Sequence, residues 1–403
     1  MDFSAESAPA DTHDSRAAGY PVVLQVLPAL GGGGVERGTV EMAAAITAAG
    51  GTALVASAGG RLAAAVEQAG GRNILLPLES KNPWRIRQNA ERLAAVIRAE
   101  KVDIVHARSR APAWSAWLAA QQTGVHFVTT YHGAYGEGLP FKRRYNAVMA
   151  RGERVIAISR FIAGLILQRH GIDPAKIRLI PRGVDTAVFD PEFVSDARVN
   201  RLADQWRLPE GRPLVMLPGR LTRWKGQEVL IDALARSARR DVVGVLVGAA
   251  QGRNRYARAL ERKAADLGVD VRLVGDCADM PAALLLADVV VSASVKPEAF
   301  GRVVIEAQAM ARPVIATDHG GAAETVEHGG TGWRVPPGDA VALAAAIDHV
   351  LAMPPERAAA MGARARGSVL AHYTTARMQA ATLDVYREVL GLIPPPDPAL
   401  RGV

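Results

Sequence analysis

Residues 295–338 read VKPEAFGRVVIEAQAMARPVIATDHGGAAETVEHGGTGWRVPPG, and the interpretation of the whole chain starts from this stretch. Glu298 lies in a Gly-containing loop, and Glu306 follows eight positions later. The residues between them pass into an apolar-periodic segment, which predicts a helix. The buried side of this helix is expected to carry Val303, Val304, Ala307 and Met310.

The amino end of this helix is suited to a phosphate, because its backbone N–H groups are unpaired and the helix dipole is positive there. Glu298 precedes that position with a carboxylate suited to sugar hydroxyls, and Glu306 could bind the hydroxyls of a ribose. Together these groups describe a nucleotide-sugar site. The predicted phosphate-binding residues are Ala299, Phe300, Gly301 and Arg302.

The pair Glu298-x7-Glu306, followed by Gly320-Gly321, by Glu324 and by a G-x-T-G-W turn, resembles the retaining family 4 glycosyltransferases. The spaced pair alone is a weak signal, and the order of the parts makes it specific. The resemblance covers residues 22–390. It implies the GT-B fold, an α/β architecture of two Rossmann-like doubly wound domains that face a central cleft, and a nucleotide-diphosphate-sugar donor.

Composition agrees with a globular chain of two domains, since 403 residues with 49% hydrophobic and 22% charged residues exceed one ordinary core. No run of eighteen apolar residues occurs, which argues against a membrane span. Residues 1–19 are expected to be a disordered tail and not a signal peptide. With the single Cys277, these features predict a cytoplasmic protein.

Repeated strand–helix alternation predicts two parallel sheets. The first domain is predicted at residues 20–190 and the second, nucleotide-sugar-binding, domain at residues 191–375. A terminal helix at about residues 376–391 is expected to pack back onto the first domain, as the resemblance implies. The looser stretch from Phe189 to Pro213 marks the predicted boundary.

The first domain opens with an apolar strand, a run of four glycines and a helix, the phosphate-binding start of a doubly wound sheet. The spacing does not make a G-x-G-x-x-G dinucleotide fingerprint, because Glu36 occupies the third glycine position. A plain tight turn is the alternative. The resemblance implies that Gly33 and Gly34 contact the donor.

Polar residues follow the predicted strands of this domain. His106 and His132 each lie just past a strand end, where a structural role is about as frequent as a functional one. The stretch Thr130-Tyr-His-Gly133 matches the family's loop beside the transferred sugar, which favours His132 as a catalytic residue. The candidate acceptor-binding residues are Arg108, Arg110, Ser159 and Arg160.

The second domain restarts with a strand, a glycine loop and a helix near Gln227. Arg220 and Lys225 lie in this loop in the family's GR-x4-KG pattern, and an arginine with a lysine suits a diphosphate leaving group. Both are predicted catalytic and donor-binding residues. The resemblance places the nucleotide base near Val274, Asp276 and Met280, whereas Asp279 could be only a helix N-cap.

The chain contains no Asp-x-Asp, the motif with which transferases of the other common architecture hold a divalent metal. The cations and the helix amino end are expected to stabilise the diphosphate instead, so a metal-independent reaction without a cofactor is predicted. The resemblance implies retention of anomeric configuration, with Glu298 on the sugar hydroxyls.

Positive charge is concentrated in residues 20–185, which hold 21 Lys and Arg against 11 Asp and Glu. Lys142, Arg143 and Arg144 open a basic helix that could rest on an anionic membrane at its cytoplasmic face, although a solvated surface is the alternative. Nucleic acid is not expected as a partner, since no recognised binding motif occurs.

Several stretches, among them SRAPAWSAW and IPRGVD, look most like bacterial lipopolysaccharide-core mannosyltransferases. This resemblance implies GDP-mannose as donor and a glycan or lipid-linked acceptor. The alternatives are a nucleotide-sugar epimerase or hydrolase of similar architecture, and a non-catalytic nucleotide-sugar-binding module. The base, the sugar, the acceptor and the oligomeric state do not follow from the residues themselves.

Overall fold

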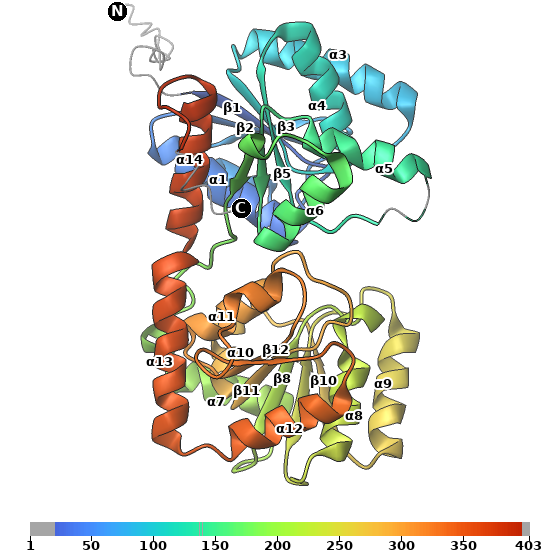
Figure 1. The fold of residues 1–403 in the computed structure, drawn as a ribbon, viewed down its shortest axis with the longest axis vertical. Helices are drawn as coiled ribbons and strands as arrows, with labels where there is room; N and C mark the ends of the chain where they lie inside the picture. The colour runs from blue at the N-terminus through green and yellow to red at the C-terminus, as the bar shows by residue number, and fades with distance from the viewer. Residues whose placement is uncertain (1–20, 137, 139, 397–403) are drawn as a thin grey trace, which may run out of the picture. The chain divides into compact units, whose positions relative to one another are not determined.

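The computed structural model describes residues 21–136, 138 and 140–396 (Figure 1). The predicted tail at residues 1–19 lies outside this part. The chain divides into two compact units. Unit 1 comprises Met1–Thr130, Arg144–Val155 and Leu383–Pro395, and unit 2 comprises Tyr131–Arg143, Ile156–Thr382 and Pro396–Val403. The domain boundaries proposed from the sequence remain predictions.

The described strands form two sheets whose pairings are parallel, which confirms the predicted α/β class. The first sheet has the order β3-β2-β1-β4-β5-β6-β7. Its strands are β1 (Val22–Val26), β2 (Thr52–Ser57), β3 (Arg72–Leu75), β4 (Ile104–Ala107), β5 (His126–Tyr131), β6 (Arg154–Ala157) and β7 (Ile177–Leu179).

The second sheet has the order β10-β9-β8-β11-β12-β13, so both sheets grow outward from their first strand in the doubly wound manner. In such sheets, ligands bind beyond the carboxyl ends of the strands where the order reverses. Its strands are β8 (Leu214–Pro218), β9 (Val243–Val247), β10 (Asp270–Gly275), β11 (Val289–Ser292), β12 (Val314–Thr317) and β13 (Trp333–Val335).

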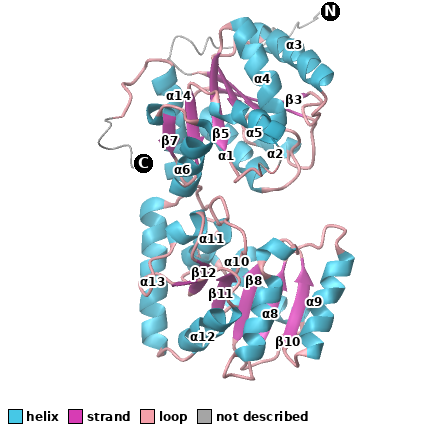
Figure 2. Ribbon diagram, turned by 45° about the vertical axis from the view of Figure 1, so that its right-hand side comes forward, coloured by secondary structure: helices cyan, strands magenta, loops and turns pink. Residues whose placement is uncertain are grey.

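Helices join successive strands and cover the sheets (Figures 1 and 2). The first part of the chain forms α1 (Gly34–Ala48), α2 (Ala63–Gln68), α3 (Pro83–Ala99), α4 (Arg110–Thr123), α5 (Pro140–Asn146), α6 (Arg160–His170) and α7 (Asp196–Trp206). The remainder forms α8 (Gln227–Arg236), α9 (Asn254–Asp266), α10 (Met280–Leu286), α11 (Arg302–Ala309), α12 (Ala340–Leu351), α13 (Pro355–His372) and α14 (Thr375–Val389). Short 3-10 turns are η2 (Ala147–Ala150), η3 (Pro174–Lys176), η4 (Pro191–Phe193), η5 (Arg223–Lys225) and η6 (Gly321–Thr325).

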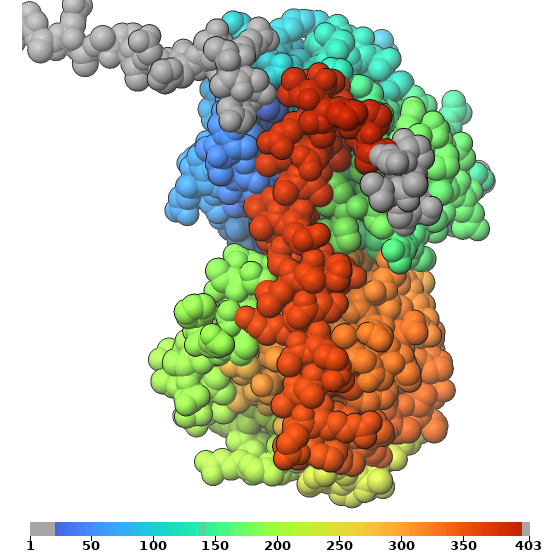
Figure 3. Space-filling view, turned by 60° about the vertical axis from the view of Figure 1, so that its left-hand side comes forward, coloured from blue at the N-terminus to red at the C-terminus, as the bar shows by residue number. Residues whose placement is uncertain are grey.

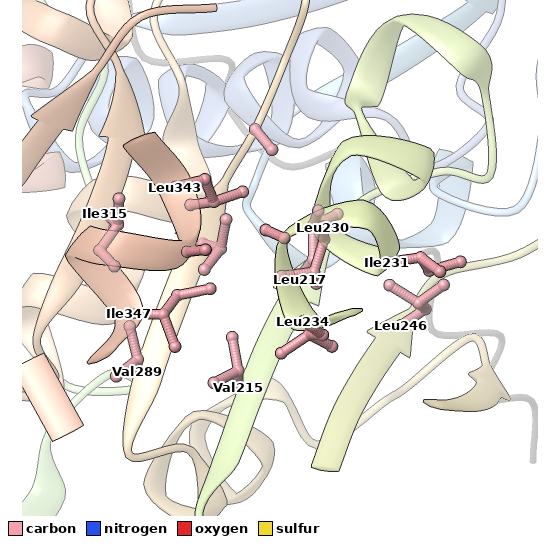
Figure 4. Packing of buried hydrophobic residues seen from close by; sticks show 14 of the residues in the cluster. Val215, Leu217, Leu230, Ile231, Leu234, Leu246, Val289, Ile315, Leu343 and Ile347 are labelled. Atoms are coloured by element: carbon pink, nitrogen blue, oxygen red, sulfur yellow. The ribbon is translucent and has the colours of Figure 1, made fainter. Parts of the chain in front are cut away.

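The core of the second sheet forms where α8 and α12 pack against its strands (Figure 4). Val215 and Val289 from the strands, and Leu230 and Ile347 from the helices, have no exposed surface. Each such side chain contributes roughly 1.5–3 kcal/mol by leaving water. This packing fixes the strand ends from which the predicted donor loops emerge.

The helix predicted around Glu306 begins later than its sequence suggests, because Ala299–Gly301 stay in the loop and α11 starts at Arg302. Val303 is half-buried, whereas Ile305 and Gln308 are buried and were not expected to be. Gln308 is retained in the core because its amide donates to the carbonyl of Thr325 at 3.0 Å.

The last two helices, α13 and α14, have exposed outer faces (Figure 3). None of the described helices combines the length and the apolar character needed to cross a membrane.

Candidate active site

The loop between β8 and α8 carries the two cations predicted to hold a diphosphate. Gly226 ends this loop in the left-handed region, with φ +76°, and a Cβ there would collide with the carbonyl oxygen of Ala293. Glycine is therefore required for the loop to pass close to the end of β11. Arg220 is exposed, and it forms no ion pair with any described residue.

Lys225 and Glu298, which lie 73 positions apart, meet as an ion pair. The Lys225 Nζ atom donates to Glu298 Oε1 at 2.8 Å, and the side chains are only 14% and 12% exposed. The ammonium also lies 4.6 Å from the ring centroid of Trp224. A buried pair of this kind is costly to break, because either partner alone would be an uncompensated charge.

Two serines complete the surroundings of the Glu298 carboxylate. The hydroxyl of Ser294 donates to Oε1, and that of Ser292 lies 3.4 Å from the same oxygen. Burial acts to raise the pKa of Glu298, but the charge of Lys225 and the hydrogen bonds outweigh it and lower this pKa. Glu298 is therefore ionised at neutral pH. Its Oε2 atom accepts no hydrogen bond within the described part of the chain.

Two consecutive glycines hold the backbone around Glu298. The amide of Gly321 donates to the Glu298 carbonyl at 2.8 Å. A Cβ on Gly320 would lie 2.5 Å from that carbonyl oxygen and 2.8 Å from the Glu298 nitrogen. The Gly320-Gly321 pair of the sequence motif thus permits the two backbones to touch.

The loop from Ala299 to Gly301 leads into α11. Gly301 is the N-cap with φ +84°, and the buried Phe300 ring packs edge-on against Tyr373, with centroids 6.0 Å apart. Arg302 is the first residue of α11, and Glu306 lies one turn further along the helix. Arg302 Nε lies 3.4 Å from Glu306 Oε1. The Glu306 side chain is 13% exposed.

The residues predicted near a nucleotide base lie at the carboxyl end of β10. Val274 is half-buried in the strand, Asp276 is exposed, and Met280 opens α10. Asp279 is the N-cap of α10, as the sequence suggested, and accepts from Ala282 N at 3.2 Å. Arg198 from α7 also donates to both of its oxygens, at 3.0 and 2.7 Å.

In unit 1, the glycine loop follows β1 as predicted. Gly33 is the N-cap of α1 and Gly34 its first residue, and both are exposed. The guanidinium of Arg61 donates to the carbonyl of Gly31 at 2.6 Å, which ties the start of the loop to the segment after β2.

Arg108 lies at the end of β4 and is only 3% exposed. Its Nη1 donates to Gln25 at 2.9 Å, and burial lowers its pKa. His106 is fully buried, with Nδ1 2.7 Å from the Tyr386 hydroxyl and Nε2 2.7 Å from the Thr130 hydroxyl. Burial, followed by the charge of Arg108, lowers the pKa of His106 well below its usual range. His106 is therefore a neutral core residue with no ring nitrogen left for an acceptor.

The remaining candidates occupy loop and helix ends. His132 follows β5 directly and is half-buried. Arg110 opens α4 and donates to the Asn146 side chain at 2.9 Å. Ser159 is the N-cap of α6, where it accepts from Ile162 N at 3.1 Å and donates to the Ala299 carbonyl at 2.7 Å. Its hydroxyl thus supports the loop beside Glu298, a contact that the sequence did not predict.

Glu324 holds the same helix end. Its carboxylate accepts from the backbone amides of Arg160 at 2.8 Å and Phe161 at 2.6 Å. Negative charge at a helix amino end is favourable because it pairs with otherwise unbonded N–H groups. The exposed Arg160 side chain itself makes no described contact with Glu324.

We expect Glu324→Ala to destabilise the protein by about 1–2 kcal/mol, the usual cost of losing an N-capping side chain. Urea unfolding at neutral pH measures this change. Glu327→Ala is the control, because Glu327 lies three residues further along in the same segment and caps no helix. Equal destabilisation by the two substitutions would contradict the capping role.

Ser292 and Ser294, whose hydroxyls lie on the Glu298 carboxylate, were not predicted, and Ser159 was predicted to bind the acceptor, not to support the loop beside Glu298. Ser292 and Ser294 precede Glu298 closely in VVVSASVKPE, and this proximity is a usable signal. Ser159 offered only its N-cap position before a helix.

The chain is similar to known proteins over both of its halves. Residues 199–368 match the family described as Glycosyl transferases group 1, and residues 32–188 match Glycosyltransferase Family 4. The D-inositol 3-phosphate glycosyltransferase of Xylanimonas cellulosilytica is 33% identical over 322 residues, 73% of this chain and 75% of that protein.

Two further proteins are similar. The GDP-mannose-dependent alpha-(1-6)-phosphatidylinositol monomannoside mannosyltransferase of Mycolicibacterium smegmatis is 35% identical over 250 residues, 56% of this chain and 63% of that protein. The crystal structure of a glycosyltransferase from Rickettsia africae matches with a TM-score of 0.86 and 37% identity, covering 92% of this chain and 99% of that one. The chain therefore belongs to the group 1, family 4 glycosyltransferases of the GT-B fold, which transfer a sugar from a nucleotide-sugar donor.

Proposed function

We propose that the protein is a retaining, metal-independent hexosyltransferase that uses a nucleotide-diphosphate hexose, with GDP-mannose as the favoured donor. The observation that carries this proposal is the buried Lys225–Glu298 pair, 2.8 Å apart. The pair holds a fixed cation beside a fixed carboxylate before the donor binds. Such preorganisation is the largest contribution in many enzymes, because no reorganisation is needed when charge develops.

Each partner retains binding capacity. Glu298 Oε1 receives the bonds from lysine and serines, so Oε2 is the atom proposed to accept from sugar hydroxyls. Lys225 has three N–H donors and uses one on Glu298, and the others are proposed to bind the diphosphate. Arg220, exposed in the same loop, is the second proposed cation on the diphosphate, and Glu306 the proposed ribose ligand.

The proposed reaction breaks the bond between the anomeric carbon and the diphosphate oxygen. Negative charge grows on the diphosphate, where Lys225 and Arg220 stabilise it. The acceptor oxygen attacks from the face that the diphosphate leaves, and its proton passes to the departing phosphate oxygen. The new glycosidic bond therefore retains the configuration, with no protein nucleophile. His132 is proposed to lie against the sugar, and Gly33 and Gly34 remain proposed donor contacts.

The acceptor is proposed to be an anionic glycan or lipid-linked glycan of lipopolysaccharide core assembly. The excess of Lys and Arg over Asp and Glu in residues 20–185 supports an anionic acceptor. Two relatives are named for phosphorylated acceptors, inositol 3-phosphate and a phosphatidylinositol monomannoside, which supports an anionic acceptor, and neither name refers to lipopolysaccharide. Arg110 and Arg160 are the proposed acceptor contacts, whereas Arg108 and Ser159 are buried and bonded to protein groups.

The protein is further proposed to work in the cytoplasm, in peripheral contact with the inner membrane face. Lys142 and Arg144 on α5 are exposed, which supports such a contact. Arg143 donates twice to the Arg169 carbonyl, at 3.0 and 2.6 Å, and so is less able to reach lipid.

Anionic vesicles should bind a Lys142→Glu/Arg144→Glu variant less well than the wild type, and undiminished binding would remove α5 from the contact.

Calorimetric titration with GDP, UDP and ADP in the presence of a chelator tests the donor. We expect selective binding of GDP, with Glu306→Ala weakening it by roughly tenfold or more, because one charge-assisted hydrogen bond contributes about 1.5–3 kcal/mol. His132→Ala should preserve nucleotide binding and abolish mannose transfer from GDP-mannose. Preference for UDP or ADP would overturn the mannose assignment, and equal loss of binding in both variants would overturn the residue roles.

A further inference from the structure

A groove in unit 1 lies between α3 and α4, and none of its lining residues is assigned to the donor. It encloses about 420 Å³, within the roughly 300–1,000 Å³ range of small-molecule sites. Figures 1 and 2 show the two helices side by side. Ser115 from α4 donates to the Ile86 carbonyl of α3 at 3.0 Å, so a hydrogen bond joins the two helices that form the groove.

The lining of the groove is largely apolar. Pro83 and Ile86 from α3 meet Trp114 and Leu118 from α4, and the Tyr145 ring closes one side. The Trp114 indole N–H donates to the Tyr145 backbone carbonyl at 3.0 Å, and the centroids of the two rings lie 6.4 Å apart. The hydroxyl of Tyr145 is buried, and no described residue bonds it. A buried hydroxyl of this kind normally has a partner, which at this position is a water or a ligand atom.

Trp84 follows the lining residue Pro83 in the sequence, and its side chain is 81% exposed. Its place is fixed by the first turn of α3, where Pro83 follows the N-cap Asn82, whose side chain accepts from Trp84 N at 2.9 Å. Tryptophan is enriched at membrane–water interfaces, because its ring is apolar and its N–H is polar.

The rim of the groove is cationic. Lys81 and Arg87 both line the cavity and are exposed, and Arg85 lies between them in the sequence. None of the three forms an ion pair within the described part of the protein. An apolar groove with an exposed tryptophan and unpaired cations is complementary to one kind of molecule, an anionic amphiphile.

We propose that the groove between α3 and α4 binds an anionic phospholipid of a membrane surface. The acyl region of the lipid lies on Ile86, Trp114 and Leu118, its phosphate is bound by Lys81 and Arg87, and an ester oxygen accepts from Tyr145. The proposal adds a site to the membrane contact proposed for α5 and does not depend on the sugar donor. Its tests use no nucleotide sugar, so they can fail while the transferase assignment stands.

Sedimentation with vesicles measures the binding. The full-length protein should bind phosphatidylcholine vesicles that contain about 30% phosphatidylglycerol, and bind pure phosphatidylcholine weakly. Lys81→Glu/Arg87→Glu should lower the binding at least about tenfold, since each cation near an anionic surface is worth about a factor of five. The matched control is Arg258→Glu/Arg262→Glu, an equal charge change on exposed residues of α9. A similar loss in the control would reduce the effect to net charge and overturn the site.

Tryptophan quenching locates the lipid. Phosphatidylglycerol with brominated acyl chains should quench part of the fluorescence of the wild type, and Trp84→Phe should remove much of the quenched part while still binding vesicles. Trp84→Ala should weaken binding several-fold, whereas Phe193→Ala, which removes another exposed ring (72%), should not. The proposal would be overturned if Trp84→Phe left the quenching unchanged. It would also be overturned if glycerol phosphate bound saturably to the groove in the absence of vesicles.

Discussion

Replacing Lys225 by alanine is expected to lower kcat/KM by at least about 10²–10³-fold, the effect of removing one group that stabilises developing charge. The same change should destabilise the fold by about 3 kcal/mol, because it leaves the Glu298 carboxylate, 12% exposed, without its counter-ion. Initial rates of sugar transfer measure the first effect, and urea unfolding at pH 7 measures the second.

The destabilisation caused by Lys225→Ala should become smaller as the pH falls. In the wild type the pKa of Glu298 is lowered, so the stability from this group is present above the unfolded pKa, about 4.3, and is lost as the pH falls through the folded value. In Lys225→Ala, burial acts with no attraction from the lysine, and the pKa of Glu298 rises above about 4.3. Lowering the pH then protonates and stabilises the variant, so its deficit should shrink between pH 7 and pH 4.

A double-mutant cycle separates the pair from general damage to the loop. Glu298→Gln keeps the side-chain volume and removes the charge, so Lys225→Ala/Glu298→Gln should be more stable than the sum of the single changes predicts, by at least about 1 kcal/mol. Additive effects, or a deficit in Lys225→Ala that does not vary with pH, would show that the pair is not coupled.

Replacing Gly320 by alanine is expected to abolish most donor binding and also to destabilise the protein. Gly320 has φ +64° and ψ −165°, a region that is essentially restricted to glycine. An added Cβ would also press on the backbone of Glu298, 2.5 Å from its carbonyl oxygen. Strain of about 1–3 kcal/mol, together with a shifted loop, should displace the carboxylate from Lys225.

Gly338→Ala is the matched control. Gly338 also has positive φ, +77°, but a Cβ there would meet nothing within 4 Å. The Gly338→Ala variant should therefore have only the conformational strain of alanine at positive φ. Its affinity for the nucleotide, measured by calorimetry, should be close to that of the wild type. If Gly338→Ala weakened nucleotide binding as much as Gly320→Ala, the close backbone approach at Glu298 would not be the cause.

The secondary structure could be predicted well where the apolar pattern was unambiguous. The apolar patterns of residues 52–57 and 126–131 predict strands, that of residues 355–372 predicts a helix, and the structure has these three elements with the same bounds. The start of α11 was predicted too early, because Ala299–Gly301 could equally extend a helix. These residues are held in a loop by the contact with Gly320-Gly321, some twenty residues away. Helix propensity is a local property and does not detect such a contact.

The candidate site shows the same limit. The residue types of Lys225 and Glu298 followed from the motifs, but their pairing across 73 positions depends on the order of β8 and β11 in the sheet. Arg108 and Ser159 were predicted to face an acceptor, since polar residues after strands commonly do. Both side chains are buried by elements distant in sequence, and local residue patterns carry no measure of that burial.

The end of α14 bears on the order in which the chain can fold during synthesis. Tyr386 is fully buried against His106, and Glu388 binds Arg154 at 2.7 Å, with both partners in unit 1. These partners are made long before Leu383–Pro395 leave the ribosome. At about 5–20 residues per second, the nascent unit 1 waits roughly 10–50 s for its last helix, without the partner of His106 Nδ1 and the counter-ion of Arg154. A chain that terminated before Leu383 would lack both contacts permanently.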